Sequence, residues 1–490
     1  MAEIEPIPDG GRVGQHCMVA TGHPVAAKEA LAVLDRGGSA VDAAIAADAI
    51  LGVVEPMATG IGGDLLAMIV EPNGSAVTYN GTGRAPLGLS PDMVDALPGR
   101  RIPDRHSLSV TTPGVIRGWF DLHGRYGRIA MADLLAPAIR LAAEGFAVGP
   151  IAAREWKFFD SLIAGDAACA ALYRAGNPPA AGEAFANAEL AAVLDAVAHD
   201  GPAAFYEGAP AAAAARASRA SGGVLSEHDF AAHRGNFDSP LSTGFRGLSV
   251  LECPPNTHGR AALDALGALE PLALDPEDPQ TMVAAVEAMR DGMIKARQTV
   301  ADPAGNTVCT AMVDRDGLGI TLMSSVFKRF GAAIGVPGAG FVLQNRGSGF
   351  AEPGHVNGPA PGKRAYHTVI PAAALKDGRL HAVFGVVGGA MQPQGHVQLM
   401  MRIAAWGEPL QAALDAPRWR LEGDDLLAIE DGMAPDVVAA LRGAGFADTH
   451  GLGNIAGRSD FGGAQVVIRA DDGTLRGASD KRKDGTALGR

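Results

Sequence analysis

The sequence predicts an α+β protein in which β-sheets pack between layers of helices. Helical periodicity dominates the first 300 residues, and strand-like alternation between short turns dominates the C-terminal third. Hydrophobic residues make up 47% of the 490 residues and charged residues 19%, which supplies enough apolar surface for a large core. No internal repeat of fixed period is visible.

The N-terminal region predicts two helices followed by two strands. Apolar residues keep helical spacing over residues 25–34, and the glycines at 37 and 38 end that helix. Ser39 is suited to cap a second helix over residues 40–51, which is apolar nearly all round and is therefore expected to be buried. Two strands flank a Glu-Pro-Asn-Gly turn, at residues 65–70 and 76–79.

The remaining elements follow from the same periodicities. Residues 133–235 are rich in alanine and helical in pattern, and residues 299–306 are rich in helix breakers. Further helices are expected at residues 261–272, 281–298, 395–406 and 435–444. Strands are expected at residues 245–252, 307–313, 318–325, 340–344, 369–375, 380–385 and 464–469.

Charge and cysteine content exclude several classes of function. The formal net charge is -13, which disfavours a nucleic-acid or anionic-membrane partner. The N-terminal stretch is acidic and lacks the apolar segment of a secretory signal, so a cytoplasmic location is expected. The four cysteines fit no metal-site or redox-pair spacing and are expected to be reduced, mostly buried thiols: Cys17, Cys169, Cys253 and Cys309.

Single residues say little about chemistry on their own. Thr307 stands where the breaker-rich segment meets a strand, and by itself it fits an ordinary strand position. The Gly-Ile-Gly-Gly-Asp run at 60–64 looks superficially like a phosphate loop but lacks the Lys-Ser/Thr ending. Cys309 shares the strand face of Thr307 and has no evident base partner, so it is a poor candidate nucleophile.

Longer motifs, taken together, are specific. The first half contains HPVAAKEALAVLDRGGSAVDAAIA, LGVVEPMATGIGGD and SVTTPGVIRGWFDLHGRYG. The second half contains GNTVCTAMVDRDG, PGKRAYHTVIPA, FGVVGGAMQPQG, ALDAPRWR and GASDKRKDG. In these motifs, and in their order from His23 to Asp484, the chain resembles the γ-glutamyltranspeptidase family. The resemblance implies the Ntn-hydrolase fold, a four-layer αββα sandwich of two stacked, mainly antiparallel sheets.

The resemblance also implies a mechanism. Thr307 matches the family's nucleophile, and its own α-amine would serve as the base, with an ordinary pKa of about 7.7–8.0. Since that nitrogen is a non-basic amide in the intact chain, the Asn306–Thr307 bond must break first, giving chains 1–306 and 307–490 of one Ntn-hydrolase unit. Gly388 and Gly389 match the oxyanion-hole glycines. Ser325 matches a threonine that supports the nucleophile.

The departures from the family concern the substrate. Thr82 stands where γ-glutamyl enzymes carry the arginine for the substrate carboxylate, with Arg84 two residues later, and Gly349 stands where they carry an acid. The paired serines correspond to His367 and Thr368, and an asparagine corresponds to Phe327. Because charged contacts of this kind are worth several kcal/mol each, a γ-glutamyl group is not the expected preferred substrate.

Two candidate substrate contacts stay open at this point. Arg346 either binds a substrate carboxylate bidentately or is a structural arginine. His367 either orients the substrate or is a satisfied structural histidine.

The leading hypothesis is therefore a self-processing hydrolase of a small amide or acyl-amide, in the divergent branch that includes oxamate amidohydrolase and transpeptidase-like proteins. Cephalosporin acylases also belong to the wider family. One alternative is a γ-glutamyltransferase or glutathione hydrolase whose substrate clamp is rebuilt from Arg84 and Arg346. Another is a catalytically inactive binding homologue, against which Thr307, Ser325 and the glycine pair argue. No metal, cofactor, nucleic acid or membrane is indicated. The expected partners are a small-molecule amide and the heavy–light heterodimer itself, with a dimer of heterodimers left open.

Overall fold

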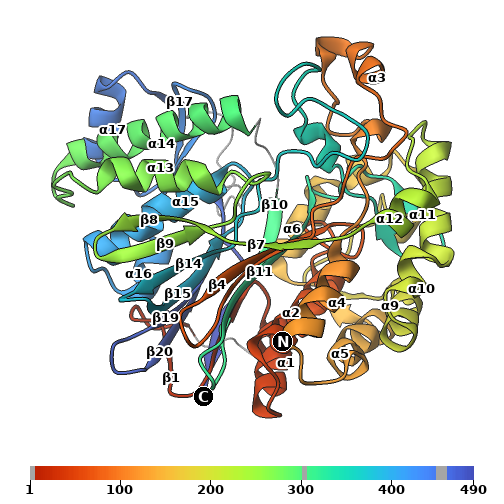
Figure 1. Cartoon of the computed structure of the whole chain (residues 1–490), viewed down its shortest axis with the longest axis horizontal. Coiled ribbons are helices and arrows are strands. Elements are labelled where there is room, and N and C mark those ends of the chain that lie inside the picture. The colour runs from red at the N-terminus through yellow and green to blue at the C-terminus, as the bar shows by residue number, and fades with distance from the viewer. Residues whose placement is uncertain (1–5, 301–305, 449–460) are drawn as a thin grey trace.

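The computed structural model describes residues 6–300, 306–448 and 461–490, and shows two seven-stranded sheets stacked between helices (Figure 1). The β10 sheet has the strand order β21 (Thr486–Gly489), β2 (Met18–Thr21), β10 (Asn306–Val313), β11 (Gly319–Phe327), β3 (Asp64–Val70), β4 (Ala76–Asn80) and β7 (Asn236–Asp238). The β15 sheet has the order β1 (Arg12–Gly14), β20 (Leu475–Ser479), β19 (Ala464–Arg469), β15 (Arg379–Val386), β14 (Ala372–Lys376), β9 (Leu248–Glu252) and β8 (Leu241–Phe245).

The two sheets face each other across an apolar interface. All neighbouring strands within each sheet are antiparallel. Side chains from both sheets form one buried cluster between them, for example Met68 and Ala311 from the β10 sheet with Val383 and Val467 from the β15 sheet. This packing of inward-facing residues from stacked sheets is the expected core of a sandwich.

One helical layer covers the outer face of the β10 sheet (right-hand side of Figure 1). Its central helix is α2 (Ala40–Val54), which is buried almost throughout and starts with a capping box between Ser39 and Asp42, as the sequence predicts. The layer and its extension contain α1 (Pro24–Asp35), α4 (Val115–Tyr126), α5 (Met131–Glu144), α6 (Pro150–Phe158), α7 (Asp160–Ile163), α8 (Ala167–Leu172), α9 (Ala188–Asp200), α10 (Ala203–Tyr206), α11 (Ala209–Ala220) and α12 (Glu227–Ala232).

The second helical layer covers the β15 sheet and completes the αββα arrangement (Figure 1). It contains α13 (Gly259–Leu269), α14 (Pro279–Thr299), α15 (Met391–Met400), α16 (Leu410–Asp415) and α17 (Pro435–Gly443). A small sheet extends it, with β16 (Trp419–Leu421), β17 (Leu426–Ile429) and β18 (Ala447–Asp448). The remaining elements are α3 (Pro91–Asp95) and the pairs β5 (Phe146–Ala147) with β6 (Ala184–Phe185) and β12 (Gly335–Val336) with β13 (Phe341–Val342).

Two sequence-based elements need correction. The single strand expected at 245–252 is a hairpin, because Arg246 and Gly247 both have positive φ (50° and 77°) and form a turn between β8 and β9. The helix expected at 395–406 begins earlier, at Met391, and its last turn, Met401–Ala405, is π-helical. Pro393 does not break α15 because it lies in the first turn, where no intrahelical donor is needed.

The cysteines and the lengths of the helices can also be compared with what the sequence predicts. All four cysteines are buried, as expected. Among the helices that the structure describes, none is both long enough and apolar enough to cross a bilayer.

Candidate active site

The first residues of β10 mark the centre of the candidate site. Asn306 pairs with Phe327 and Val308 with Ser324, so the register shifts across Thr307. One residue of β10 therefore faces two residues of β11 at this point, which is a β-bulge, a feature frequent next to active sites. The side chains of Asn306 and Thr307 lie outside the described part of the structure, so the site is defined here by what surrounds them.

A buried carboxylate, Asp64, lies at the start of β3 and was not singled out as a site residue from the sequence. Its Oδ1 accepts hydrogen bonds from the Gly83 N–H at 2.6 Å and from Gln344 Nε2 at 2.8 Å. Its Oδ2 accepts from His367 Nε2 at 3.0 Å and lies 3.4 Å from Arg346 Nε. We call Asp64, Gln344, Arg346 and His367 the Asp64 cluster. All four side chains are fully buried.

The glycines before Asp64 are required by close packing. A Cβ on Gly62 would lie 2.0 Å from the Val342 carbonyl oxygen, and one on Gly63 would lie 2.3 Å from the Ser325 carbonyl oxygen. Both contacts are far inside van der Waals distance with backbone atoms that cannot move aside. The Gly-Ile-Gly-Gly-Asp run is therefore not a phosphate loop. The two glycines let the chain pass close to β11, so that Asp64, the next residue, lies in the site.

Asp64 stays ionised despite its burial. Burial on its own would raise the pKa of this carboxyl, but the hydrogen bond from His367, the charge of Arg346 and the hydrogen bond from Gln344 together hold the pKa below its ordinary value. An ionised Asp64 keeps its two oxygens as acceptors, which orients each of its donors.

His367 is a neutral donor in this arrangement. Its Nδ1 accepts the Val369 N–H at 3.1 Å, so the ring proton is on Nε2, which donates to Asp64. Burial, and then the charge of Arg346, lower the pKa of His367 to about 4, so the ring is uncharged at neutral pH. In this structure His367 is a fully buried donor that holds Asp64.

Arg346 is the one group of the cluster that has unused hydrogen-bonding capacity and a charge. Its guanidinium stacks 3.9 Å from the ring centroid of Phe327, and Nη1 donates to Thr368 Oγ1 at 3.3 Å. Nη2 has no hydrogen-bond partner in the described residues, although the side chain is fully buried. Burial lowers the pKa of Arg346 to about 10, against the opposing effect of Asp64, so the group remains cationic at neutral pH.

Phe327 connects this cluster to the start of β10. It is the backbone partner of Asn306, and it adopts a positive φ of 76° while its ring stays buried against Arg346. A left-handed conformation is a strained one for an aromatic residue and is characteristic of functional sites. The arginine therefore lies beside the predicted cleavage point.

The structure brings together four of the five substrate-binding residues expected from the sequence: Phe327, Arg346, His367 and Thr368. Arg84 is not among them. Its side chain is exposed and donates from Nη1 to the Gly362 carbonyl oxygen at 3.2 Å at the surface, while its backbone forms a β-bridge with Arg364. Thr82, at the position of the family's carboxylate-binding arginine, is buried and its Oγ1 has no partner among the described residues.

Ser325 is buried on β11, opposite the bulge at Thr307. Its Oγ accepts the Phe327 N–H at 2.8 Å. The hydroxyl therefore helps to hold the backbone turn that carries Phe327, in addition to lying across from the start of β10.

Gly388 and Gly389 form the turn between β15 and α15. Both have positive φ, 119° and 64°, which favours glycine. A Cβ on Gly388 would lie 3.0 Å from both Gly462 Cα and Met391 Cβ, so the turn is also tightly packed. Cys309 of β10 packs against Val387, directly before this turn, which places the turn and the start of β10 on the same side of the interface between the sheets.

Helix α15 is held by polar side chains that sequence reasoning missed. Each of four buried residues accepts a backbone N–H from a different neighbouring position: Gln392 from Ile370 at 2.9 Å, Gln394 from Leu421 at 2.7 Å, His396 from Val386 at 3.2 Å and Gln398 from Trp419 at 3.1 Å. His396 also contacts the buried Glu252 through Nδ1 at 2.5 Å. The signal in the sequence is the alternation of polar residues in Gln-Pro-Gln-Gly-His-Val-Gln on a helix that is otherwise apolar. These bonds fix the helix that follows the glycine turn.

The chain is similar to known proteins over nearly its whole length. The sequence profile described as gamma-glutamyltranspeptidase matches residues 26–308 and 301–490. The chain is 33% identical to the oxamate amidohydrolase proenzyme of Klebsiella pneumoniae and 31% identical to the glutathione hydrolase-like YwrD proenzyme of Bacillus subtilis. In both cases the match covers 97% of this chain and 99% of the relative.

The fold comparison extends over the whole chain. The crystal structure of cephalosporin acylase from Bacillus halodurans matches with a TM-score of 0.91 and 32% identity, covering 100% of this chain and 99% of that one. The αββα layers described above are thus shared with a solved enzyme. The chain therefore belongs to the gamma-glutamyltranspeptidase family, and it is a self-processing amide hydrolase with the N-terminal-nucleophile fold.

Proposed function

We propose that this protein cuts its own chain between Asn306 and Thr307 and then hydrolyses a small amide that carries a carboxylate near the scissile bond. The two products, residues 1–306 and 307–490, stay together as one heterodimer because β10 lies at the centre of a sheet whose other strands come from both parts. Cleavage turns the Thr307 nitrogen from an amide into an amine with a pKa near working pH, which is the base that the hydroxyl needs.

The catalytic steps follow from this pairing. The Thr307 amine takes the hydroxyl proton as the oxygen attacks the substrate carbonyl, and backbone N–H groups at Gly388 and Gly389 stabilise the negative charge on the carbonyl oxygen. The leaving nitrogen takes the proton, the C–N bond breaks, and an ester on Thr307 remains. Water, deprotonated by the same amine, then hydrolyses the ester and regenerates the hydroxyl. Ser325 supports the start of β10 from the neighbouring strand.

The substrate assignment rests on one observation: Nη2 of the buried Arg346 has no hydrogen-bond partner among the described residues. A buried guanidinium donor without a partner costs free energy, and natural sites leave such donors open mainly for water or a ligand. A planar carboxylate matches the guanidinium geometry. Buried polar atoms of Thr82 and Gln344 also lack partners in the described residues. Because Arg346 stacks on Phe327, the strand partner of Asn306, a carboxylate held by Arg346 would lie near the start of β10, and we infer that the adjacent amide carbonyl then meets Thr307.

A matched pair of substrates tests this assignment. Oxamate and oxamide differ only in that a carboxylate replaces a neutral amide, and oxamate hydrolysis yields ammonia and oxalate. We expect the processed protein to release ammonia from oxamate with a kcat/KM at least about 30-fold above that for oxamide, since charged contacts are worth about 2–5 kcal/mol. Faster turnover of a γ-glutamyl anilide, with stimulation by an acceptor amine, would instead identify a γ-glutamyltransferase.

A second test addresses the cleavage itself. Purified protein is expected to give two bands on a denaturing gel, with the smaller chain beginning at Thr307 by mass spectrometry. Thr307→Ala is expected to remain a single chain and to lack activity, while Thr307→Ser is expected to cleave, more slowly. A wild-type protein that stays full length would support the inactive binding homologue.

A further inference from the structure

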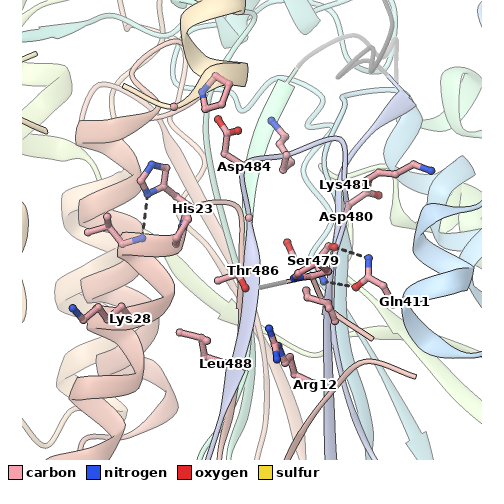
Figure 2. Close-up of a pocket in the computed structure, with 18 of the residues that line it drawn as sticks. Arg12, His23, Lys28, Gln411, Ser479, Asp480, Lys481, Asp484, Thr486 and Leu488 are labelled. Atoms are coloured by element: carbon pink, nitrogen blue, oxygen red, sulfur yellow. Dashed lines mark hydrogen bonds between the residues drawn. The ribbon is translucent and has the colours of Figure 1, made fainter. Parts of the chain in front are cut away.

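A large cavity of about 1170 Å³ has a lining that shares no residue with the candidate active site described above. It lies beside β1 and β21, which are edge strands of the two sheets, and α1 forms its opposite wall (Figure 2). The connection from β5 into α6, residues of α16 and the turn between β20 and β21 also line it. This volume is of the size that holds a small organic ligand.

One part of the lining is apolar. Val25 of α1, Leu141 of α5 and Leu488 of β21 are only partly buried and face the cavity, together with Phe146 and Pro150. Partly exposed apolar side chains gathered around one concave space bind the apolar part of a ligand, because they leave contact with water when it enters.

A buried hydrogen-bond donor faces the same space. His23 is the N-cap of α1, and its Nδ1 accepts the Val25 N–H at 3.3 Å (Figure 2). The proton of the neutral ring is therefore on Nε2. His23 is only 7% exposed and lines the cavity, and its Nε2 has no partner among the described residues. The ring thus presents an unused N–H donor from within the wall.

The charges around the cavity favour an anion. Lys28 is exposed on α1, one turn after His23, and Arg12 lines the opposite side from β1 (Figure 2). Three acids line the cavity: Asp480 pairs with Arg418 and Arg482 outside the lining, Asp484 accepts the Ile151 N–H at 3.1 Å, and Oδ1 of Asp415 is buried without a partner among the described residues. Four basic residues stand against these three acids: Arg12, Lys28, Lys481 and Lys483. Positive charge here stands out in a chain whose net charge is -13.

We propose that this cavity is a second ligand site, which binds a small organic anion with an apolar body. The His23 Nε2–H and the Lys28 ammonium hold the acidic head, and the side chains around Leu488 hold the apolar part. This site is independent of the hydrolytic centre and does not depend on the reaction proposed for it.

Octanoate, 1-octanol and octylammonium test the proposal, because they share one tail and differ in head-group charge. Isothermal titration calorimetry with the full protein is expected to give an octanoate dissociation constant at least about tenfold below that of octylammonium. His23→Asn keeps the cap, because asparagine is a good N-cap residue, and removes the Nε2–H donor. We expect His23→Asn and Lys28→Gln each to weaken octanoate binding at least about fivefold.

Two control variants localise the effect. Lys157→Gln removes an exposed lysine outside the cavity, and Arg346→Gln removes the cation of the candidate active site; neither is expected to change octanoate affinity. The proposal is wrong if octanoate does not bind, if the three ligands bind equally, or if only Arg346→Gln weakens binding. A dimer in light scattering that Leu488→Lys dissociates would show that a second copy of the chain fills the cavity instead.

Discussion

Two groups of buried charges in this molecule are built in opposite ways. The Asp480 cluster, which consists of Asp480, Arg418, Arg482 and Glu430, surrounds the turn after β20. Asp480 accepts from Arg418 Nη2 at 2.6 Å, from Arg482 Nη1 at 3.0 Å and from the Ala464 N–H at 3.0 Å. Burial alone would raise the pKa of Asp480, but the two arginines lower it to about 2. Each carboxylate oxygen of this residue has partners.

The arginines of the Asp480 cluster are equally well satisfied. Arg482 donates from Nε to Glu430 at 2.8 Å, from Nη1 to the Leu414 carbonyl at 3.0 Å and from Nη2 to the Ala416 carbonyl at 2.9 Å. In the Asp64 cluster, by contrast, Arg346 has an unpaired Nη2 within the described residues. The comparison separates two uses of buried charge: complete pairing fixes a backbone, whereas incomplete pairing leaves capacity for a ligand.

The largest expected effect comes from breaking the saturated cluster. Arg482→Met leaves Glu430 without its arginine, leaves Asp480 with Arg418 as its remaining side-chain donor, and removes the donor to the Ala416 carbonyl, so the unfolding free energy should fall by about 3–5 kcal/mol. Urea unfolding measures this loss. Glu430→Gln, which keeps the shape of the side chain and removes one charge, should cost less and gives a folded variant for comparison. A change below 1 kcal/mol in Arg482→Met would contradict a structural role.

Breaking the open cluster should affect activity far more than stability. Arg346→Met removes the proposed carboxylate contact, so kcat/KM for oxamate should fall by about 10²–10³-fold. Asp64 keeps its donors from Gly83, Gln344 and His367, so the unfolding free energy should change by less than about 2 kcal/mol. Turnover of oxamide serves as the control and should change little. Equal losses for both substrates would contradict the contact.

The two clusters should also respond to acid in different pH ranges. The pKa of His367 is lowered from 6.5 to about 4, so the folded state binds fewer protons than the unfolded state between these values, and stability falls as pH falls from 6.5 to 4. The pKa of Asp480 is lowered from 3.8 to about 2, so its contribution is complete above about pH 4 and is lost only below it.

Urea unfolding between pH 7 and pH 4 measures this difference. His367→Gln keeps a donor for Asp64 and cannot be protonated, so it should reduce the pH slope by up to about 1.4 kcal/mol per pH unit. Burial also lowers the pKa of His233 and His258, each to about 3, so part of the slope remains in the variant. If His367→Gln leaves the pH slope unchanged, the pKa of His367 does not differ between the folded and the unfolded protein, which would contradict this assignment.

The sequence predicts most of the fold because periodicity and capping are local signals. The Ser39 cap and the apolar circumference of α2 are read directly from neighbouring residues, and so is the β10–β11 hairpin. The single strand expected at 245–252 was wrong because the chain turns there at Arg246, a residue type that rarely takes a positive φ.

The candidate site is harder to predict because its contacts join distant segments. Arg346 and His367 were recognised only through motif resemblance, which left their roles open. Asp64 was missed because its three donors come from residues 83, 344 and 367, and no local pattern reports such a meeting. The same holds for the glutamines of α15, whose acceptor role depends on the ends of strands that are far away in the chain.

The smallest expected effect distinguishes the two arginines considered for the substrate. The Arg84 side chain is exposed and donates to one surface carbonyl, so Arg84→Gln should change kcat/KM for oxamate by less than about twofold and stability by less than about 0.5 kcal/mol. Steady-state kinetics beside Arg346→Met provides the comparison. If Arg84→Gln raised KM tenfold or more, the substrate would be held by two arginines, as in a rebuilt γ-glutamyl clamp. If the effect of Arg84→Gln is negligible, the carboxylate is recognised by Arg346, because of these two arginines Arg346 is the one that is buried away from water and has a donor, Nη2, without a partner among the described residues.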